Sequence, residues 1–306
     1  MNQTRIPDEV VLVDDGSTDG TGDWIRSHYP QTQVLTTPNG GTSRARNRGA
    51  QEAHGDVLVF LDHDDTLLPH AVDTLVRLLA EFPEARAAFA DHIYTNLATG
   101  IRYENHHSSQ PSFHRLSSIP AIRQNGNARL YGRSMHRALL HGNLLQQPWA
   151  IHRQTFLELK GFEPDIRYCE DWDLYLRIAA AVPLVLSDEV ISNHIIEGEN
   201  LHLAQGQEAM HQRVILRQIR ACFPARPREV ITLCRRLANY RKCAGDLARQ
   251  EQRIADAWKL NLQAALLWPR DHVVVGRLML WAPRALWEMI LQSAQRHRDH
   301  KGEFSK

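Results

Sequence analysis

The chain has 306 residues, of which 43% are hydrophobic and 23% are charged, as is usual for a globular protein. Its formal net charge of +1 gives no electrostatic basis for binding nucleic acid, which we exclude as the main partner. The four cysteines lack CxxC spacing and no run of about 18 apolar residues occurs, so we expect reduced thiols in a cytoplasmic protein without a membrane-spanning helix.

The first ninety residues alternate between predicted strands and predicted helices. Continuous apolar runs predict strands at residues 10–13, 33–37, 57–61 and 85–90. Helical patterns fall between them, at residues 18–28, 42–54 and 69–81. Uninterrupted apolar strands separated by helices predict an α/β fold, with a mostly parallel, Rossmann-like sheet flanked by helices. Ligands of such sheets bind at the carboxyl ends of the strands.

The later part of the chain predicts a change of architecture. Residues 95–126 are rich in Asn, Ser, His, Pro and Gly and predict a long loop. A helix is expected from near Asp171, followed by short strands at residues 184–186 and 190–196. Beyond residue 205 the pattern is almost wholly helical to residue 296. We therefore predict a catalytic domain over residues 1–204 and a helical C-terminal extension over residues 205–306.

Two carboxylates follow the predicted strand at residues 57–61. On extended chain Asp62 and Asp64 point the same way, and paired carboxylates at a strand end suit Mg²⁺ or Mn²⁺ bound to substrate phosphates. The alternative is a solvated acidic turn in which Asp65 or Thr66 caps the next helix. The apolar strand directly before the pair favours the metal site.

Asp14 and Asp15 close an earlier strand in the same way, either as a ligand-binding pair for a nucleobase or ribose or as part of a polar turn. Between the two acidic segments, the glycine pair at residues 40–41 precedes several arginines. A helix N-terminus of this composition suits an anionic ligand, although a solvated basic first turn is an equal alternative.

Two further candidates lie late in the predicted catalytic domain. Asp171, preceded by Glu170, is either a helix cap or a general base that deprotonates an acceptor hydroxyl. His194, after the strand predicted to begin at residue 190, is a candidate contact for a metal ion or a phosphate.

Taken in order, the segments VDDGSTDGT, NGGTSRARNRGA, GDVLVFLDHDDTLLP and KGFEPDIRYCEDWDLYLR resemble the family 2 glycosyltransferases of the GT-A fold. The resemblance covers about residues 7–194. The family members that it points to are those of bacterial surface-polysaccharide synthesis. It implies transfer of a sugar from a nucleotide-sugar donor, such as a UDP-sugar, to a hydroxyl, with inversion and with Mg²⁺ or Mn²⁺.

The resemblance also implies roles at the donor. It places Asp14 and Asp15 at the base and ribose of the nucleotide. It places Arg46 and Asn47 beside the nucleotide, and Asp62 at the ribose.

Toward the acceptor, the resemblance implies that Asp64 coordinates the metal ion, with His194 as a second metal contact. Asp171 would be the catalytic base and Glu170 would lie near the acceptor. The chain has Lys160 where family members usually have the first glycine of a GGF motif.

The implied acceptor is a saccharide or a lipid-linked saccharide. The C-terminal helices carry an apolar group that either contacts the inner face of the plasma membrane peripherally or packs against the catalytic domain. Its members are Leu278, Leu280, Trp281, Leu286, Trp287 and Ile290.

Family members have a strand and a helix before the segment that matches residues 10–21. We therefore expect this chain to begin late, without about 30 residues, the size of a strand-plus-helix unit. That expectation raises the alternative of an inactive or binding-only protein with a transferase-like fold. A phosphate-accepting receiver domain is a further alternative, which the DxD segment and the later Glu-Asp pair disfavour.

Overall fold

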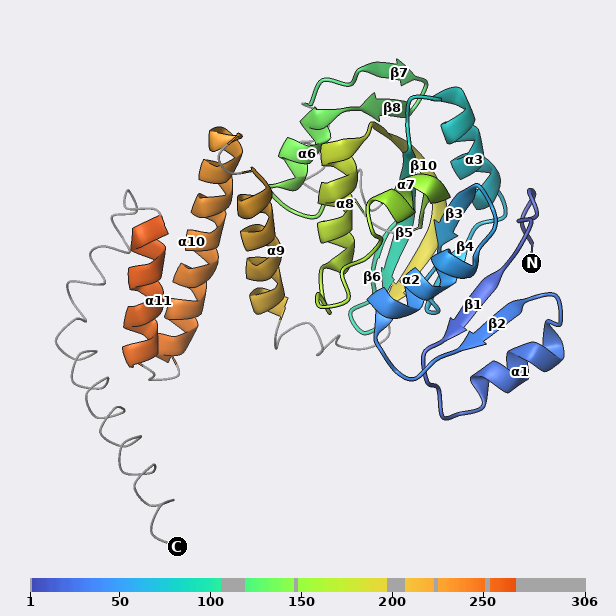
Figure 1. Cartoon of the computed structure of the whole chain (residues 1–306), viewed down its shortest axis with the longest axis horizontal. Coiled ribbons are helices and arrows are strands. Elements are labelled where there is room, and N and C mark those ends of the chain that lie inside the picture. Colours follow the sequence, from blue (N-terminus) through green and yellow to red (C-terminus); the bar gives the residue numbers. More distant parts are fainter. Residues whose placement is uncertain are drawn as a thin grey trace, which may run out of the picture. The chain divides into compact units, whose positions relative to one another are not determined.

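The computed structural model describes residues 2–105, 119–145, 148–196, 207–222, 225–250 and 254–267 (Figure 1). It divides the chain into two compact units, Met1–Val214 and Ile215–Lys306. The predicted domain boundary at residues 204 and 205 stays a prediction.

The first unit begins with two parallel strands and two helices. Strands β1 (Val11–Asp14) and β2 (Gln33–Thr36) pair in parallel, and helices α1 (Thr21–His28) and α2 (Thr42–Glu52) follow them in turn. All four elements were predicted. Helix α2 packs closely on β1, because a Cβ atom at Gly49 would lie only 3.3 Å from the Val13 side chain.

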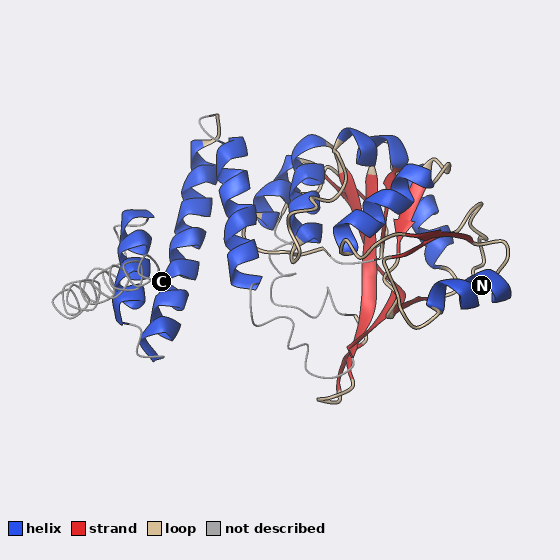
Figure 2. Ribbon diagram, turned by 60° about the horizontal axis from the view of Figure 1, so that its bottom comes forward, coloured by secondary structure: helices blue, strands red, loops and turns tan. Residues whose placement is uncertain are grey.

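An eight-stranded sheet forms the centre of the first unit. Its order is β3-β9-β5-β10-β8-β7, with β4 paired to β10 and β6 paired to β5. The strands are β3 (Val57–Phe60), β4 (Asp65–Leu67), β5 (Ala87–Asn96), β6 (Ile101–Tyr103), β7 (Arg123–Asn125), β8 (Ala128–Tyr131), β9 (Trp149–His152) and β10 (Leu184–Ile196). The helices of this part are α3 (Ala71–Glu81), α6 (Arg133–Leu139), α7 (Arg153–Glu158) and α8 (Glu170–Ala181). Figure 2 shows the strands between helices.

The sheet is mixed, so the prediction of a mostly parallel sheet was wrong, whereas the α/β class with flanking helices is confirmed. Only the β1–β2 and β5–β10 pairings described are parallel, and the other six are antiparallel. An apolar run shows that a strand is buried on both faces but not in which direction it runs. The hairpins β5–β6 and β7–β8 and the returning strand β9 supply most of the antiparallel pairings.

Two local predictions also differ from the structure. Residues 184–196 form one strand rather than two, because register shifts between Leu186 and Ser192 let β10 continue past an irregularity. The predicted loop at 95–126 contains β6 and β7, and its residues 106–118 lie outside the described ranges.

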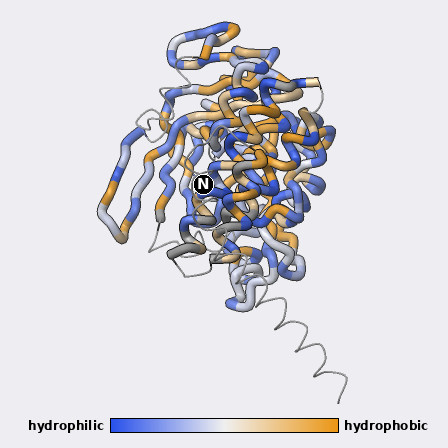
Figure 3. The backbone as a smooth tube through the Cα atoms, turned by 90° about the vertical axis from the view of Figure 1, so that its left-hand side faces the viewer, coloured by the Kyte–Doolittle hydropathy of each residue, from blue (hydrophilic) through white to orange (hydrophobic). Residues whose placement is uncertain are grey.

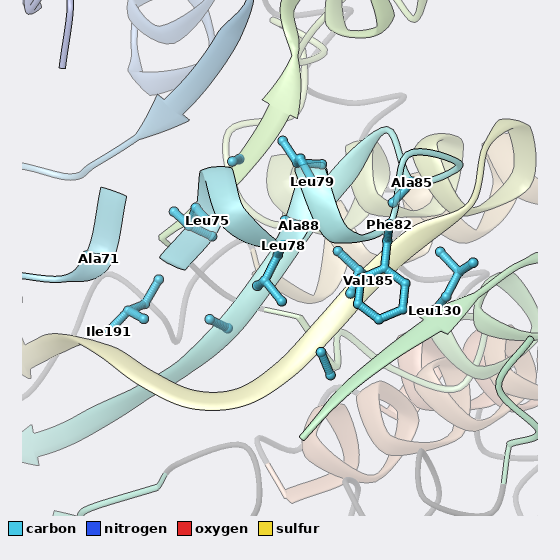
Figure 4. Close-up of a cluster of buried hydrophobic side chains, with 13 residues drawn as sticks. Ala71, Leu75, Leu78, Leu79, Phe82, Ala85, Ala88, Leu130, Val185 and Ile191 are labelled. Atoms are coloured by element: carbon cyan, nitrogen blue, oxygen red, sulfur yellow. The ribbon is translucent and has the colours of Figure 1, made fainter. Parts of the chain in front are cut away.

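Helix α3, which falls in the helical pattern predicted at residues 69–81, covers the sheet with an apolar face. Leu75, Leu78 and Phe82 are almost fully buried against residues of β5, β8 and β10, among them Ala88 and Val185 (Figure 4). Burying each large side chain contributes about 2 kcal/mol. Coloured by hydropathy, the backbone shows hydrophobic stretches that alternate with hydrophilic ones (Figure 3). This packing fixes the strand ends on which the candidate site is built.

The second unit is helical over its described part, as predicted. It contains the end of α9 (Gln207–Cys222), together with α10 (Pro227–Gln250) and α11 (Ile254–Leu267). Among the described helices we find none with an apolar stretch long enough to cross a bilayer. The apolar group at residues 278–290 lies outside the described ranges.

Candidate active site

The acidic segment after β3 forms a tight turn. The backbone N–H of Asp65 donates to the carbonyl of Asp62 at 3.2 Å, and β4 begins at Asp65. Neither Asp65 nor Thr66 caps the next helix, because α3 begins at Ala71 with His70 as its N-cap. The turn instead gathers three carboxylates, those of Asp62, Asp64 and Asp65, with oxygen atoms within 4.8 Å of one another.

These three carboxylates fit a divalent cation such as Mg²⁺ or Mn²⁺. Such hard cations bind oxygen ligands, commonly one or two carboxylates together with the phosphates of a substrate. Asp64 is exposed, Asp62 is half-buried and Asp65 is buried, so the cluster opens to solvent through Asp64.

His194 lies against the same cluster. The antiparallel pairing of β10 with β4 sets His194 opposite Asp65, and the imidazole Nδ1 lies 2.6 Å from the Asp65 carboxylate. This hydrogen bond raises the pKa of His194, the nearby charges of Asp65, Asp64 and Asp62 add to the rise, and burial opposes it. With Nδ1 directed at Asp65, the other ring nitrogen, Nε2, is left for a ligand.

Arg46 connects the acidic turn to the start of α8. From helix α2, its Nη2 contacts the Asp62 carboxylate at 2.6 and 2.8 Å, and its Nη1 contacts Glu170 at 2.9 Å. The Arg46 and Glu170 side chains are only 11% and 14% exposed. The guanidinium also lies over the Phe162 ring, 5.1 Å from its centroid. One buried cation therefore holds three segments together that are distant in sequence.

The Glu-Asp pair lies in the first turn of α8. The helix begins at Glu170, so Asp171 is not its N-cap; Cys169 occupies that position with a left-handed φ of 64°. The Asp171 carboxylate accepts the N–H of Trp172 at 2.7 Å and a hydrogen bond from Asn143 Nδ2 at 2.7 Å. Asp171 is thereby fixed at both carboxylate oxygens.

Burial raises the pKa values of both acidic residues of the pair. For Glu170, the charge of Asp171 adds to the rise and Arg46 opposes it. For Asp171, the hydrogen bonds from Trp172 and Asn143 and the charge of Arg46 oppose the rise. A carboxylate with a raised pKa is a stronger base, which suits proton abstraction from a hydroxyl.

Tyr175 lies one helical turn after Asp171 and is fully buried. Its hydroxyl has no hydrogen-bond partner among the described residues. Burial, together with the charges of Asp171 and Asp62, raises the pKa of Tyr175 far above its usual value, so the phenol stays protonated.

Asp14 and Asp15 stabilise the loops at the end of β1. Asp14 accepts the N–H of Ser17 at 2.9 Å, and hydrogen bonds from Ser17 lower its pKa. Asp15 accepts the N–H groups of Gly40 and Gly41 at 2.9 and 2.7 Å. The amide groups of this glycine pair, for which an anionic ligand and a solvated turn were equal alternatives, therefore donate to a carboxylate of the protein itself, which fixes the start of α2.

Asn47 clamps the segment before α8. Its Nδ2 donates to the Phe162 carbonyl and its Oδ1 accepts the Phe162 N–H, both at 2.8 Å. Gly161 has a φ of 59°, and a Cβ atom there would meet Asn47 and lie 2.9 Å from the Phe156 ring. Lys160, at the family's usual glycine position, adopts a left-handed φ of 64°, which costs a non-glycine residue about 1–2 kcal/mol.

The structure thus links Asp62, Asp64, Arg46 and Glu170 in one region, with His194 joined through Asp65. No described hydrogen bond or ion pair joins Asp14 or Asp15 directly to this region. Helix α2 links them indirectly, because Asp15 accepts a hydrogen bond at its N-terminus and Arg46 lies in its second turn.

Sequence reasoning did not identify three neighbours of the site. Asp65 was considered only as a helix cap, although its place beside Asp64 in the DxD turn was a usable signal. Tyr175 was expected only as part of the helix that begins near Asp171. Asn143 stands in a connecting segment 28 residues before Asp171, and no pattern pointed to it.

Among known proteins, residues 1–140 match the family model described as Glycosyl transferase family 2. An uncharacterized glycosyltransferase of Haemophilus influenzae is 24% identical over 177 residues, which cover 58% of this chain and 53% of that protein. The hyaluronan synthase of Pasteurella multocida is 22% identical over 227 residues, covering 71% of this chain and 20% of the synthase. This chain therefore spans about half or less of the length of these relatives.

Among solved structures, the crystal structure of S. aureus TarS 1-349 aligns with a TM-score of 0.56 and 13% identity, covering 90% of this chain and 81% of that chain. At this identity the similarity shows the fold alone, and it confirms the GT-A-like α/β architecture. The family match rests on the segment that contains the DxD turn and Arg46. Residues 1–140 of the chain are thus similar to glycosyl transferase family 2.

Proposed function

We propose that this chain transfers a sugar from a nucleotide-sugar donor to a hydroxyl acceptor, with inversion, in the synthesis of a bacterial surface polysaccharide or glycolipid. The observation that carries the proposal is the buried Arg46 bridge, which sets the carboxylates of the DxD turn beside the Glu170–Asp171 pair. Such a pairing places a cation site for a diphosphate next to a candidate base, as transfer to a hydroxyl requires. The family match and the relatives that are named glycosyltransferases support the same reaction class.

The donor side of the site is proposed to lie along the ends of β1 and β3. Asp14 and the loop fixed by Asp15 would contact the base and ribose, here assigned to a UDP-sugar, and Asp62 would reach the ribose. Arg46 and Asn47 would act mainly by shaping this pocket, because their polar groups already bond to Asp62, Glu170 and the Phe162 backbone.

Asp64, with His194 Nε2 as a second contact, would hold a divalent cation against the diphosphate of the donor. When bound, the cation neutralises the negative charge that develops on the departing diphosphate. Asp65 would orient His194 through its hydrogen bond to Nδ1, which leaves Nε2 as the ring nitrogen for the cation.

Asp171 is proposed as the general base of a single displacement. The acceptor oxygen forms a bond to the anomeric carbon while the bond from that carbon to the diphosphate oxygen breaks. The hydroxyl proton passes to the Asp171 carboxylate, and the electron pair of the broken bond leaves with the nucleoside diphosphate. Glu170, neutralised by Arg46, would line the acceptor side.

The acceptor is proposed to be a saccharide, free or lipid-linked. A lipid-linked acceptor would be reached by peripheral contact with the inner face of the plasma membrane through the C-terminal apolar group at residues 278–290. Flotation of the full chain with liposomes, compared with a variant in which Trp281 and Trp287 are both serine, tests this location.

Asp64→Ala tests the donor site. We expect the wild-type chain to gain thermal stability with a nucleotide-sugar donor only in the presence of Mn²⁺, and we expect the variant to lose this gain. Asp64 is exposed and makes no hydrogen bond that the structure describes, so its replacement should remove the cation contact without disturbing the fold. Asp8→Ala, which removes another exposed carboxylate, is the control and should behave as the wild type. An unchanged Mn²⁺ titration of the donor-dependent gain in Asp64→Ala would refute the assignment.

A further inference from the structure

Asn143 lies in the segment between α6 and β9, and its side-chain amide meets the proposed base. Its Nδ2 donates to Asp171 Oδ2 at 2.7 Å. We propose that Asn143 is a positioning residue for Asp171, which orients the carboxylate and holds it in the ionised form that accepts a proton. This inference rests on the proposed role of Asp171 as the base of sugar transfer.

The hydrogen bond completes a two-point support of the carboxylate. The backbone N–H of Trp172 donates to Oδ1 at 2.7 Å, and Asn143 donates to Oδ2 at 2.7 Å. A carboxylate held at both oxygens is restrained from rotating about its Cβ–Cγ bond. Each oxygen has two acceptor directions, so the support leaves capacity for an incoming hydroxyl. Precise placement of a base is worth a large part of its catalytic effect.

The surroundings of Asn143 fix which end of its amide faces Asp171. The Leu145 N–H lies 3.4 Å from Asn143 Oδ1, and Leu145 is fully buried in the core. The amide oxygen is therefore turned toward Leu145, and the nitrogen is directed at Asp171. An ionised carboxylate only accepts hydrogen bonds, so the opposite amide orientation would set two acceptors against each other.

The segment that carries Asn143 is anchored close to α8. Trp172, the neighbour of Asp171, donates its indole N–H to the carbonyl of Leu139 at 2.8 Å, and both side chains are buried. This contact joins the end of α6 to the first turn of α8. The approach of Asn143 to Asp171 is thus built into the packing of these two helices.

The charges around Asp171 explain why a neutral hydrogen-bond donor stabilises its ionised carboxylate. Arg46 from α2 is bonded to Asp62 and Glu170, so much of its positive charge is already compensated. Asp62 raises the pKa of Asp171, and the buried phenol of Tyr175, on α8 itself, is a further titratable neighbour. The amide of Asn143 is uncharged, so its stabilisation of the ionised carboxylate is not reduced by pairing with other acidic residues, as that of Arg46 is.

We expect Asn143→Ala to raise the pKa of Asp171. The acid limb of the profile of kcat/KM against pH should move up by about 1 pH unit, so kcat/KM at pH values below the limb should fall about tenfold and recover at higher pH. The KM for the donor should not change, because the donor side lies at the DxD turn. Asn143→Asp, which keeps the shape but adds a negative charge, should move the limb further.

The matched control is Asn125→Ala. Asn125 is also exposed and donates to a carboxylate, that of Glu81 at 3.3 Å, but it lies on β7 away from the site. Its profile should coincide with that of the wild type. A purely structural role for Asn143 would lower the rate at every pH without moving the acid limb, and that result would overturn the proposal.

A ¹³C NMR titration of the Asp171 carboxyl, assigned by its absence in Asp171→Asn, separates this inference from the proposed function. The resonance should titrate at higher pH in Asn143→Ala and in Asn143→Asp than in wild type and in Asn125→Ala. An unchanged titration in folded Asn143→Asp would overturn the inference. If the wild type transfers no sugar to any acceptor, the proposed function fails, but the titration still decides whether Asn143 controls Asp171.

Discussion

Asp171→Asn is expected to lower the turnover number about a thousandfold while leaving donor affinity within about twofold of the wild type, since general-base catalysis contributes about 10²–10⁴-fold. An amide has nearly the shape of the carboxylate, but it cannot take up the hydroxyl proton. The donor contacts lie on the other side of the Arg46 bridge, at Asp62 and Asp64. The loss should therefore appear in the chemical step alone.

Single-turnover transfer and donor titration, measured on the same preparation, check this expectation. Asp165→Asn is the control, because Asp165 is an exposed carboxylate bonded to Arg213 rather than to the site, and it should retain the wild-type rate. Retained transfer by Asp171→Asn would exclude Asp171 as the base. Lost donor binding would show that the residue belongs to the donor pocket instead.

Arg46→Met should destabilise the first unit by about 3 kcal/mol, because breaking a buried ion pair leaves an uncompensated carboxylate. For a unit of this size the melting temperature should fall by about 6–12 °C. Glu170 is nearly buried, whereas Asp62 is a third exposed and partly compensated by water, so Glu170 should account for most of the loss. Transfer activity should be lost as well, since the bridge aligns the two halves of the site.

The pH dependence of this destabilisation identifies its cause. Arg46 lowers the pKa of Glu170 against burial, so the ion pair contributes where Glu170 is ionised, and the contribution disappears as the pH falls and the carboxyl takes up a proton. The stability difference between wild type and Arg46→Met should therefore shrink in acid. It is measured by thermal or denaturant unfolding at several pH values.

Arg48→Met provides the matched control on the same helix. Arg48 forms an exposed ion pair with Glu52 at 2.9 Å, four residues along α2. Its loss should cost less than about 1 kcal/mol. Equal destabilisation by the two variants, or a difference that does not depend on pH, would show that Arg46 acts through packing rather than through its charge.

The sequence was sufficient for the elements that carry the DxD turn and the Arg46 helix. Apolar runs and helical periodicity predicted β1, β2, β3 and α2 to within a few residues. The gathering of Asp62 and Asp64 followed from their place directly after a buried strand. These features depend on local pattern, which a single sequence displays.

Features that depend on tertiary packing were not predictable in the same way. The direction of β9 and the continuity of β10 are set by partner strands rather than by their own residues. Likewise, the contact of Asn143 with Asp171 arises from the packing of α6 on α8. Asp15 is a similar case: the sequence left open a ligand contact or a polar turn, and did not show that its carboxylate accepts the N–H groups of Gly40 and Gly41.

Release of nucleoside diphosphate from a panel of nucleotide sugars is the most direct measurement of the proposed sugar transfer. The chain is incubated with each donor and a set of saccharide acceptors, in the presence of Mn²⁺, Mg²⁺ or a chelator. We expect at least one donor to release its diphosphate with a cation, to stop doing so with the chelator, and to stop in Asp171→Asn. If the chain binds donors but releases no diphosphate with either cation, or binds none of them, the proposal that it is an active sugar transferase is contradicted.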